Sequence, residues 1–252
     1  MGTDHVALPE NYRLQFHHEL DSTNAEGLRL IAAGEPENLW VWALRQSGGR
    51  GRHGRTWQSL EGNLFASLLL RPQCDARSAS QLGFVGAVAV FDAVAVLAAD
   101  HEVDLKLKWP NDLLLNGRKA AGLLLESTSG SNGRLSVVMG VGINLAAHPQ
   151  DVPFPATDLA CHAAETTPPE ALQQLARTTA QWLSVWNEGR GFEPIRAAWD
   201  ERSLPKGTAV QVRLADERLN GSYRGLDENG GLILAQADGS ERRITTGDVF
   251  PL

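Results

Sequence analysis

Apolar and polar positions change period several times along residues 14–150. Residues 39–46 and 63–71 are apolar runs of strand length bounded by glycine-rich or polar segments. Residues 79–100 form a long Ala-rich apolar stretch that predicts a helix. In residues 103–109 apolar and charged side chains alternate with a period of two, which predicts a half-buried strand. This succession of strands and helices predicts a mixed sheet with helices packed on it.

Local signals mark where further elements begin and end. Ser22, in the stretch Asp-Ser-Thr-Asn, can cap a helix whose apolar positions follow at helical spacing. Asn116-Gly117 is a strong two-residue hairpin signal, and residues 120–126 have the pattern of the returning strand. Residues 135–144 have the pattern of another strand.

The C-terminal part predicts a loop, a helical segment and a small all-β module. Residues 146–169 contain five prolines and little periodicity, so we expect a long loop. Residues 169–199 place Ala, Leu, Trp and Phe at helical spacing, so their tryptophans are expected in the core. From Lys206 onward, short strand patterns separated by Asp- and Gly-rich turns predict a small β-barrel. We therefore expect two domains, residues 1–202 and 203–252.

Composition and charge limit the partners of this fold. With 252 residues, 42% hydrophobic and 21% charged, the chain is typical of a soluble globular protein. A net charge of -7 does not favour a duplex-DNA binder, so any positive site must be local. Cys74 and Cys161 suit neither a disulfide framework nor a zinc spacing, which favours a reducing compartment. There is no signal-peptide pattern, and Asp92 interrupts the apolar stretch 82–99, so we expect a cytoplasmic protein without a membrane span.

A glycine- and arginine-rich loop follows the predicted strand at 39–46. Residues 49–57 are GRGRHGRTW, with three glycines, three arginines and no acidic residue. Glycines let backbone N–H groups approach a ligand, and arginines bind anions through charge-assisted hydrogen bonds. The stretch is neither a Walker loop nor a dinucleotide fingerprint, because GxxxxGK[ST] is absent and no GxGxxG opens a helix. It predicts an anion site, and the alternative is a solvated basic surface loop.

Further candidates lie around the predicted hairpin and the strand at 135–144. Residues 108–112, KWPND, end a strand at a proline and present an amide and a carboxylate, although a plain turn has the same pattern. Lys119 is flanked by small apolar residues. It either faces a site as a point cation or protects an edge strand from aggregation. Residues 140–144, GVGIN, indicate close approach of a ligand or of another backbone to a strand, or a bulge.

Together these stretches closely resemble the biotin protein ligases, enzymes that attach biotin to a carrier lysine. The resemblance rests on Ser22-Thr23-Asn24, Gln46 with GRGRHGRTW, KWPNDLLLNGRKAAG at 108–122, and GVGINL at 140–145. It covers essentially the whole chain. It implies an α+β fold, in which a class II synthetase-like catalytic domain with a mixed sheet precedes an SH3-like β-barrel. Residues 1–13 are too short for the helix-turn-helix of the family's regulatory members, so the resemblance implies a monofunctional ligase.

The resemblance implies a role for each matching residue. The residues expected to bind biotin are Ser22, Thr23, Asn24, Gln46, Arg50, Gly51, Arg52, Lys119 and Gly122. The residues expected at ATP or the adenylate are Arg50, Arg52, Asn111, Asp112, Lys119 and Asn144. Lys119 and Arg52 are the expected catalytic residues, because both would contact the phosphate, and no protein ligand to a metal is assigned. Trp57 is expected beneath the loop, His53 replaces a common arginine, and Phe154 is a candidate for stacking on adenine.

The implied reaction has two steps and requires ATP and Mg²⁺. Biotin's carboxylate attacks the α-phosphorus of ATP, which gives biotinyl-5′-AMP, and a lysine of a biotin carboxyl carrier protein then attacks the mixed anhydride. Two anions meet in the first step, which accounts for a cationic loop in an acidic protein. The implied partners are biotin, ATP and the carrier, with no nucleic acid and no membrane, and a homodimer is left open. The loop is expected to be mobile when empty.

Three alternatives stay open at this point. A lipoate or octanoate ligase of the same superfold is the nearest, although an acyl tunnel would not require a polar Ser-Thr-Asn and Gln set. A nucleic-acid binder that uses the Arg-Gly loop is opposed by the acidic net charge and by the absence of aromatic residues among the basic ones. A pseudo-enzyme that only holds the adenylate is opposed weakly by the presence of Lys119.

Overall fold

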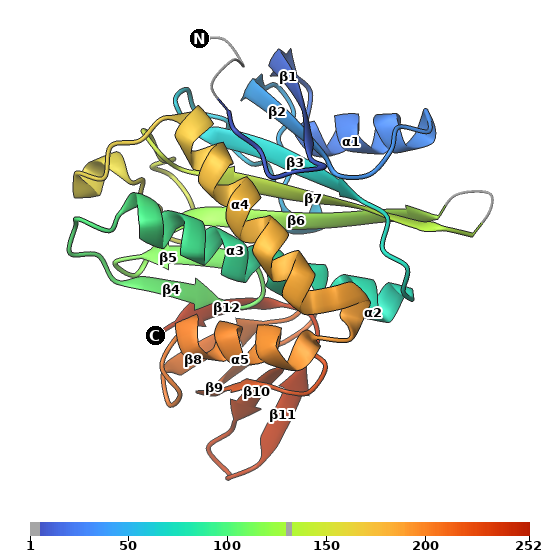
Figure 1. The fold of residues 1–252 in the computed structure, drawn as a ribbon. Coiled ribbons are helices and arrows are strands. Elements are labelled where there is room, and N and C mark those ends of the chain that lie inside the picture. Colours follow the sequence, from blue (N-terminus) through green and yellow to red (C-terminus); the bar gives the residue numbers. More distant parts are fainter. Residues whose placement is uncertain (1–5, 130–132) are drawn as a thin grey trace.

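The computed structural model describes residues 6–129 and 133–252. Its larger part contains β1 (Arg13–Leu20), α1 (Thr23–Ala32), β2 (Leu39–Gln46), η2 (Arg52–Gly54), β3 (Leu64–Leu70), α2 (Ala76–Ser80), α3 (Leu82–Leu97), β4 (Leu105–Lys108), β5 (Asp112–Leu115), β6 (Arg118–Ser129), β7 (Leu135–Ile143), η3 (Ala160–His162), α4 (Pro168–Trp186), η4 (Asn187–Gly189) and α5 (Phe192–Arg202). The strands form a seven-stranded sheet in the order β1-β2-β3-β7-β6-β5-β4 (Figure 1). The β1–β2 pair is parallel and the β2–β3 pair antiparallel, so the sheet is mixed, as predicted.

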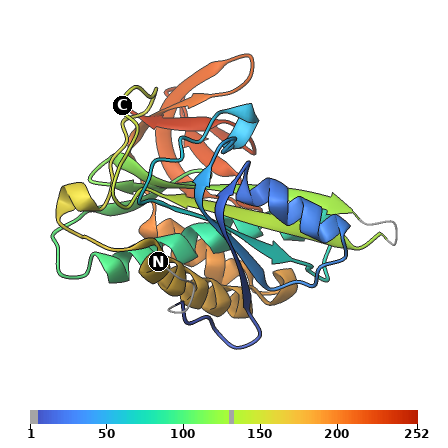
Figure 2. The same cartoon turned by 90° about the horizontal axis from the view of Figure 1, so that it is seen from above.

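The two faces of this sheet carry different side chains, because successive strand residues point to opposite sides. On β3, Leu64, Leu68 and Leu70 belong to the main apolar core that α3 and α4 cover. Ser67 points to the opposite face, where α1 packs and where its hydroxyl meets Asn24. The helices thus lie on both sides of the sheet (Figure 2), and the α1 side keeps small and polar positions for a site.

The helical segment predicted over residues 169–199 is two helices. α4 ends at Trp186, and the next two residues, Asn187 and Glu188, have positive φ angles of 44° and 57°. At Gly191 a Cβ atom would lie 1.9 Å from the carbonyl oxygen of Val185, so the chain needs glycine there to turn into α5. The helical character predicted for residues 169–199 is therefore confirmed, and this turn divides the segment into two helices.

The apolar stretch predicted as one helix over residues 79–100 forms α2 and α3, which meet at Gln81. By length and composition the segment Ala76–Leu97 could cross a membrane, but half of its most apolar 18 residues are buried inside the fold. Core helices of soluble proteins have the same length and composition. The contacts of α3 with α4, α5 and β6 account for its burial.

The C-terminal module is an antiparallel sheet of short strands. It contains β8 (Ala209–Arg213), β9 (Arg218–Leu226), β10 (Leu232–Ala235), β11 (Glu241–Ile244) and β12 (Asp248–Pro251), in the order β11-β10-β9-β8-β12. The Tyr223 hydroxyl lies 3.0 Å from Ser203 Oγ, and Trp109 Nε1 donates to the Gly230 carbonyl at 3.1 Å. These buried contacts fix the module against the end of α5 and the strand end at Trp109. The small all-β module is confirmed, whereas the division at residue 202 stays a prediction.

Candidate active site

One pocket on the α1 side of the sheet brings together the residues singled out from the sequence. Its cavity is about 230 Å³. Its lining includes Ser22, Thr23, Asn24, Gln46, Arg50, Gly51, Arg52, Asn111, Asp112, Lys119, Gly122 and Asn144. Trp57 and Phe154 line it too, as does Lys108 of the KWPND stretch, together with Asp248 and Phe250, which were not singled out. The fold therefore brings residues from widely separated stretches of the chain to one place, and their roles toward ligands stay proposals.

Uncharged polar groups at the start of α1 form one side of the pocket. Ser22 has extended backbone angles and caps the helix, with its hydroxyl accepting from the Ala25 N–H at 3.4 Å. The Thr23 N–H donates to Gln46 Oε1 at 2.8 Å, so the helix start is bonded to the end of β2. The Ser22 cap and the Thr23–Gln46 bond therefore hold the polar side chains at the start of α1 in place before any ligand binds.

Ser67 of β3 belongs to the same polar cluster, although it was not predicted from the sequence to be a site residue. Its fully buried hydroxyl lies 2.8 Å from Thr23 Oγ1 and 2.6 Å from Asn24 Oδ1. Asn24 Nδ2 in turn donates to Glu126 Oε2 at 2.8 Å. The one signal was a lone hydroxyl in the apolar run LFASLLL, where alternation places it on the face opposite the core leucines.

Strand glycines make room for the larger pocket side chains. A Cβ atom on Gly142 would lie 2.5 Å from Trp57 Cε2, and one on Gly122 would lie 3.0 Å from Trp57 Cζ3. These two glycines face each other across β6 and β7. A Cβ atom on Gly140 would lie 2.1 Å from Asn24 Oδ1. The close approach predicted for these glycines is thus made by protein side chains, and the Trp57 ring packs against the strand backbone at Gly122 and Gly142.

Two lysines share one buried carboxylate at the junction of β4, β5 and β6. Lys119 Nζ lies 2.6 Å from Asp112 Oδ1, and Lys108 Nζ lies 2.8 Å from Asp112 Oδ2. Burial alone would raise the pKa of Asp112, but the two ammonium groups outweigh it and hold that pKa well below the usual value. One positive charge is left over in this group of three. Because β6 lies between β5 and β7, the edge-strand explanation for Lys119 is wrong.

The arginines of the glycine-rich loop are paired with carboxylates of other segments. Arg50 contacts Glu126 at 3.0 Å. Arg55 makes two bonds to Asp248 of β12, at 2.7 and 2.8 Å, and Arg52 donates to the Gly247 carbonyl at 3.1 Å. The loop is closed on itself by the Gly51 N–H bond to the Arg55 carbonyl at 2.7 Å. The C-terminal module therefore holds this basic loop, whose Arg50 and Arg55 side chains remain half exposed, and the anion site stays a prediction.

The remaining wall comes from the loop after β7. Asn144 is buried and donates through Nδ2 to the Thr157 carbonyl at 3.0 Å, while the Thr157 N–H bonds to the Lys119 carbonyl at 2.9 Å. The Phe154 ring lies between Lys108, whose Nζ is 5.0 Å from the ring centroid, and Phe250 of β12, at 6.2 Å between centroids. The predicted long loop thus lies alongside the start of β6, and Phe154 joins it to the C-terminal module.

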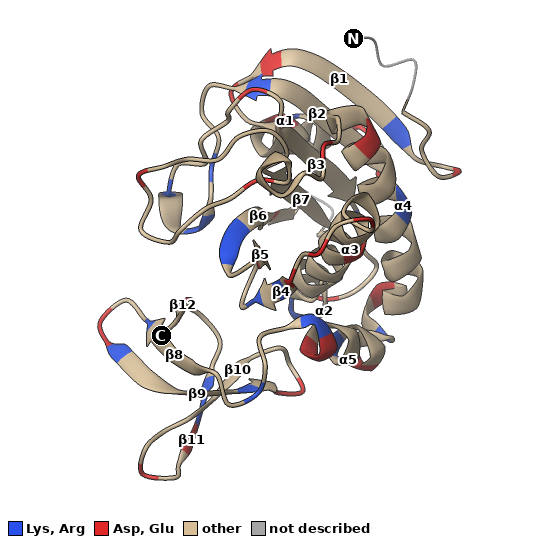
Figure 3. Cartoon of the chain, turned by 90° about the vertical axis from the view of Figure 1, so that its left-hand side faces the viewer, with Lys and Arg blue, Asp and Glu red and all other residues tan. Residues whose placement is uncertain are grey.

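The charged residues of the pocket lining have a positive surplus, although the chain is acidic. The cations Arg50, Arg52, Arg55, Lys108 and Lys119 line it, against the carboxylates of Asp112 and Asp248, a surplus of three positive charges. Figure 3 shows Lys and Arg segments of β4 and β6 on the side of the sheet that faces the C-terminal module. An uncharged polar side and a cationic side in one cavity suit a ligand with a neutral polar head and an anionic tail.

Comparisons with known proteins agree with this geometry. Residues 19–144 match the biotin/lipoate A/B protein ligase family, and residues 207–250 match the biotin protein ligase C terminal domain. The biotin–[acetyl-CoA-carboxylase] ligase of Paracoccus denitrificans is 41% identical over 91% of this chain and 97% of its own length. The bifunctional ligase/repressor BirA of Bacillus subtilis is 32% identical, over 94% of this chain and 73% of its own length.

A solved structure gives the same result for the fold. The biotin protein ligase from Aquifex aeolicus in complex with biotin and ATP superposes with a TM-score of 0.79 and 28% identity, over 94% of this chain and 97% of that one. The family match covers both the sheet and the C-terminal module. The chain belongs to the biotin/lipoate A/B protein ligase family and, within it, to the biotin protein ligases.

Proposed function

We propose that this protein is an ATP-dependent ligase that forms biotinyl-5′-AMP and transfers biotin to a lysine of a biotin carboxyl carrier domain. The observation that carries this proposal is one pocket with a neutral hydrogen-bonding side and a cationic side. Relatives named for biotin–[acetyl-CoA-carboxylase] ligation and a structure with biotin and ATP support it. We expect the enzyme to act in the cytoplasm.

The neutral side suits the ureido ring of biotin. This ring offers one carbonyl and two N–H groups, which hydroxyls and amides satisfy without a charge. Ser22, Thr23 and Asn24 lie at the helix start, with Gln46 beside them, and all four line the pocket. An acyl chain such as octanoate or lipoate has no such polar head, so this side of the pocket favours biotin over the acyl chains of the related ligases.

The cationic side suits the meeting of a carboxylate with the α-phosphate. In the first step, a biotin carboxylate oxygen bonds to the α-phosphorus while the bond to the departing pyrophosphate breaks. Lys119 already lies beside a carboxylate oxygen, that of Asp112, at 2.6 Å, and Lys108 keeps Asp112 neutralised if Lys119 turns to the substrate. Fixed cations at the developing charge are worth several kcal/mol of barrier, about 3 to 4 for one good donor.

Magnesium would arrive with the nucleotide. The pocket carboxylate nearest to Lys119 is Asp112, and both of its oxygens are paired with lysines. We therefore expect Mg²⁺ to be held mainly by phosphate oxygens and water, as is usual for nucleotide-bound magnesium. The residues of the chain then position the phosphates, with Arg52 and Lys119 as the expected contacts.

The second step needs no nucleophile from the protein. The amine of the carrier lysine attacks the acyl carbon of the adenylate, the bond to the phosphate oxygen breaks, and AMP leaves. The loop at residues 49–57 would cover the adenylate before the carrier arrives, since a mixed anhydride must be kept from water. Its ion pairs with Glu126 and Asp248 hold it beside the pocket.

The direct test is transfer of label. We expect the protein, incubated with MgATP, labelled biotin and a biotin carboxyl carrier domain, to label the carrier covalently and to release AMP. Octanoate and lipoate offered in parallel should give no transfer. Absence of both labelled carrier and AMP would disprove the ligase function, whereas transfer of octanoate instead of biotin would move it to the related acyl ligases.

A further inference from the structure

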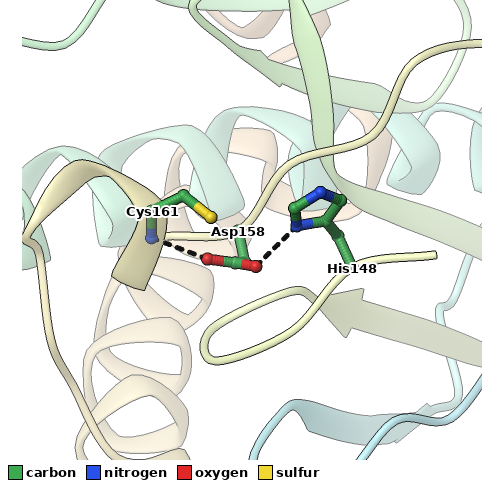
Figure 4. A group of neighbouring side chains, drawn as sticks. All are labelled: His148, Asp158 and Cys161. Atoms are coloured by element: carbon green, nitrogen blue, oxygen red, sulfur yellow. Dashed lines mark hydrogen bonds and ion pairs between the residues drawn. The ribbon is translucent and has the colours of Figure 1, made fainter. Parts of the chain in front are cut away.

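A histidine, an aspartate and a cysteine come together in the segment after β7. His148 stands near the beginning of the loop, Asp158 stands near its end, and Cys161 lies in η3 (Figure 4). Their ligand atoms all lie within 4.8 Å of one another. Asp158 is buried, His148 is partly buried and Cys161 is exposed, so the group is closed on the protein side and open to solvent at the sulfur.

The existing contacts orient these groups toward a common centre. His148 Nδ1 lies 2.6 Å from Asp158 Oδ2, and the Cys161 N–H donates to Asp158 Oδ1 at 2.8 Å. The neighbouring His162 is engaged elsewhere, with Thr157 Oγ1 at 3.0 Å. The cluster therefore offers one nitrogen, one carboxylate oxygen and one sulfur, the set of donors that zinc binds in proteins.

The spacing can be compared with that of a tetrahedral zinc site. Zinc bonds to nitrogen, oxygen and sulfur place the ligand atoms about 3.3 to 3.6 Å apart. The His148–Asp158 pair, at 2.6 Å, would have to open by about 0.7 Å, and the sulfur would have to close by about 1.2 Å at most. A surface cysteine on a short 3₁₀ turn can make that movement by side-chain rotation.

We propose that His148, Asp158 and Cys161 bind a Zn²⁺ ion that joins the two ends of this loop. Zinc would take the place between His148 Nδ1 and Asp158 Oδ2, the single proton of the neutral imidazole would then sit on Nε2, and the thiol proton would leave to solvent. Water would complete the coordination. The nitrogen and sulfur donors discriminate against Mg²⁺, which prefers oxygen ligands, so nucleotide-bound magnesium would not compete.

The consequence for the pocket follows from where the loop lies. Pro149, Val152 and Phe154 line the pocket between the proposed ligands. The Asn144 side chain already bonds to the Thr157 carbonyl, next to Asp158. A metal at the two ends would shorten the free part of the loop and reduce its motion, which lowers the entropy cost of ordering this wall. The site is separate from the proposed chemistry, so it stands or falls independently of the ligase function.

The test is metal binding to the full chain. We expect the purified protein to bind one equivalent of Zn²⁺, and Co²⁺ in its place to give tetrahedral d–d bands and a near-ultraviolet sulfur-to-cobalt band. Cys161→Ser should abolish the sulfur band and weaken binding by at least about tenfold, and His148→Gln should weaken it similarly. Cys74→Ser, which changes the other cysteine, is the matched control and should leave the spectrum unchanged.

Each outcome of this experiment decides the proposal. Because Cys161 is exposed, Cys161→Ser should fold normally, and circular dichroism verifies this. Zinc should also increase the hydrogen-exchange protection of residues 149–157 in the unmodified chain and not in Cys161→Ser. The proposal is overturned if no metal binds, if binding is unchanged in Cys161→Ser and His148→Gln, if it is lost in Cys74→Ser, or if Mg²⁺ displaces Co²⁺ readily.

Discussion

The two sides of the pocket satisfy their polar groups in different ways. Thr23 and Asn24 at the start of α1 and Ser67 of β3 are buried and bonded to one another, and Asn24 is also bonded to Glu126. On the loop side, the arginine side chains remain half exposed, 43% at Arg50 and 54% at Arg55, and they pair with carboxylates. Exposed ion pairs contribute little, about 0 to 1 kcal/mol each, whereas an unsatisfied buried polar group costs about 1 to 3 kcal/mol.

This difference suits the α1 side to recognising a ligand and the loop side to closing over it. A buried, mutually bonded group cannot rearrange cheaply, so the α1 side presents a fixed shape to a neutral ligand head. The arginines can exchange their carboxylate partners for phosphate or carboxylate oxygens of a ligand at small cost. The loop side can therefore adapt when an anionic ligand binds. Substitutions on the first side should therefore change binding and stability together, and substitutions on the second should change activation or loop motion with little effect on stability.

Lys119→Ala should have the largest effect on activity. It tests whether adenylate formation and biotin binding depend on different sides of the pocket. Asp112 keeps Lys108 as a partner, so the variant should fold normally. We expect adenylate formation to fall about 100-fold or more, because a fixed cation at the developing charge is lost. Biotin affinity should fall far less, since the α1 side is untouched. Pyrophosphate release and calorimetric biotin binding measure the two quantities.

The control for this variant is Lys106→Ala. Lys106 lies on β4, which β5 separates from the strand of Lys119, and it pairs with the exposed Asp104, so its loss should leave both quantities unchanged. Equal losses of biotin affinity and of adenylate formation in Lys119→Ala would contradict the role assigned to this lysine.

Gly142→Ala should distort the packing of Trp57 against the strand backbone in the pocket. The new Cβ atom would lie 2.5 Å from the Trp57 ring, and strands on both sides hold the backbone in place. We expect a loss of about 1 to 3 kcal/mol of unfolding free energy from overpacking. Biotin binding should weaken as well, and urea unfolding with calorimetry measures both.

Two further variants separate this clash from a general effect of alanine. Gly83→Ala, where a Cβ atom meets nothing within 4 Å, should leave stability unchanged or slightly raised. In a Trp57→Leu background the cost of Gly142→Ala should shrink, because the ring is gone. An undiminished cost in that background would show that the glycine serves another purpose.

Ser67→Ala tests the rigid side directly. Removing the hydroxyl leaves Asn24 Oδ1 and Thr23 Oγ1 without this partner, which should cost about 1 to 2 kcal/mol of unfolding free energy. Biotin affinity should fall several-fold, because the side chains that face the ligand lose their fixed orientation. Ser80→Ala, an exposed serine of α2, is the matched control. Unchanged biotin affinity in Ser67→Ala would contradict a preorganised α1 side.

The sequence predicted local structure well and long-range pairing less well. The strand at residues 39–46 has the predicted bounds, and Asn116 and Gly117 have the positive φ angles, 50° and 75°, that their hairpin requires. The edge strand β1 was not predicted: its eight residues are partly or fully exposed, and its sequence RLQFHHEL alternates only briefly, at Leu14 and Phe16. Residues 169–199 are helical as predicted, but the break between α4 and α5 was not predicted, because helical periodicity continues across the left-handed turn at Asn187.

The site shows the same limit. Four motifs named residues that the fold brings to one pocket, because each motif fixes its own local geometry. The contacts between motifs were not predictable. Asp248 lies 193 residues after Arg55, on a strand with no charge pattern of its own, and Ser67 looks like an ordinary member of an apolar strand. Such partners are set by topology, which periodicity does not encode.

Asp248→Asn should have the smallest effect on stability and tests the exchangeable side. Arg55 loses a two-bond ion pair and Arg52 loses a carboxylate at 3.6 Å, but both sites are partly solvated, so unfolding free energy should change by less than about 1 kcal/mol. The pocket then carries one more net positive charge, and the arginines are free to meet phosphate. ATP should therefore bind a few-fold more tightly, and amide exchange in residues 51–55 should become faster. Asp238→Asn makes the same charge change at an exposed turn of the same module and should alter neither quantity. If Asp248→Asn weakened ATP binding while leaving the loop protected, the ion pairs would be part of the binding geometry rather than a restraint that the substrate replaces.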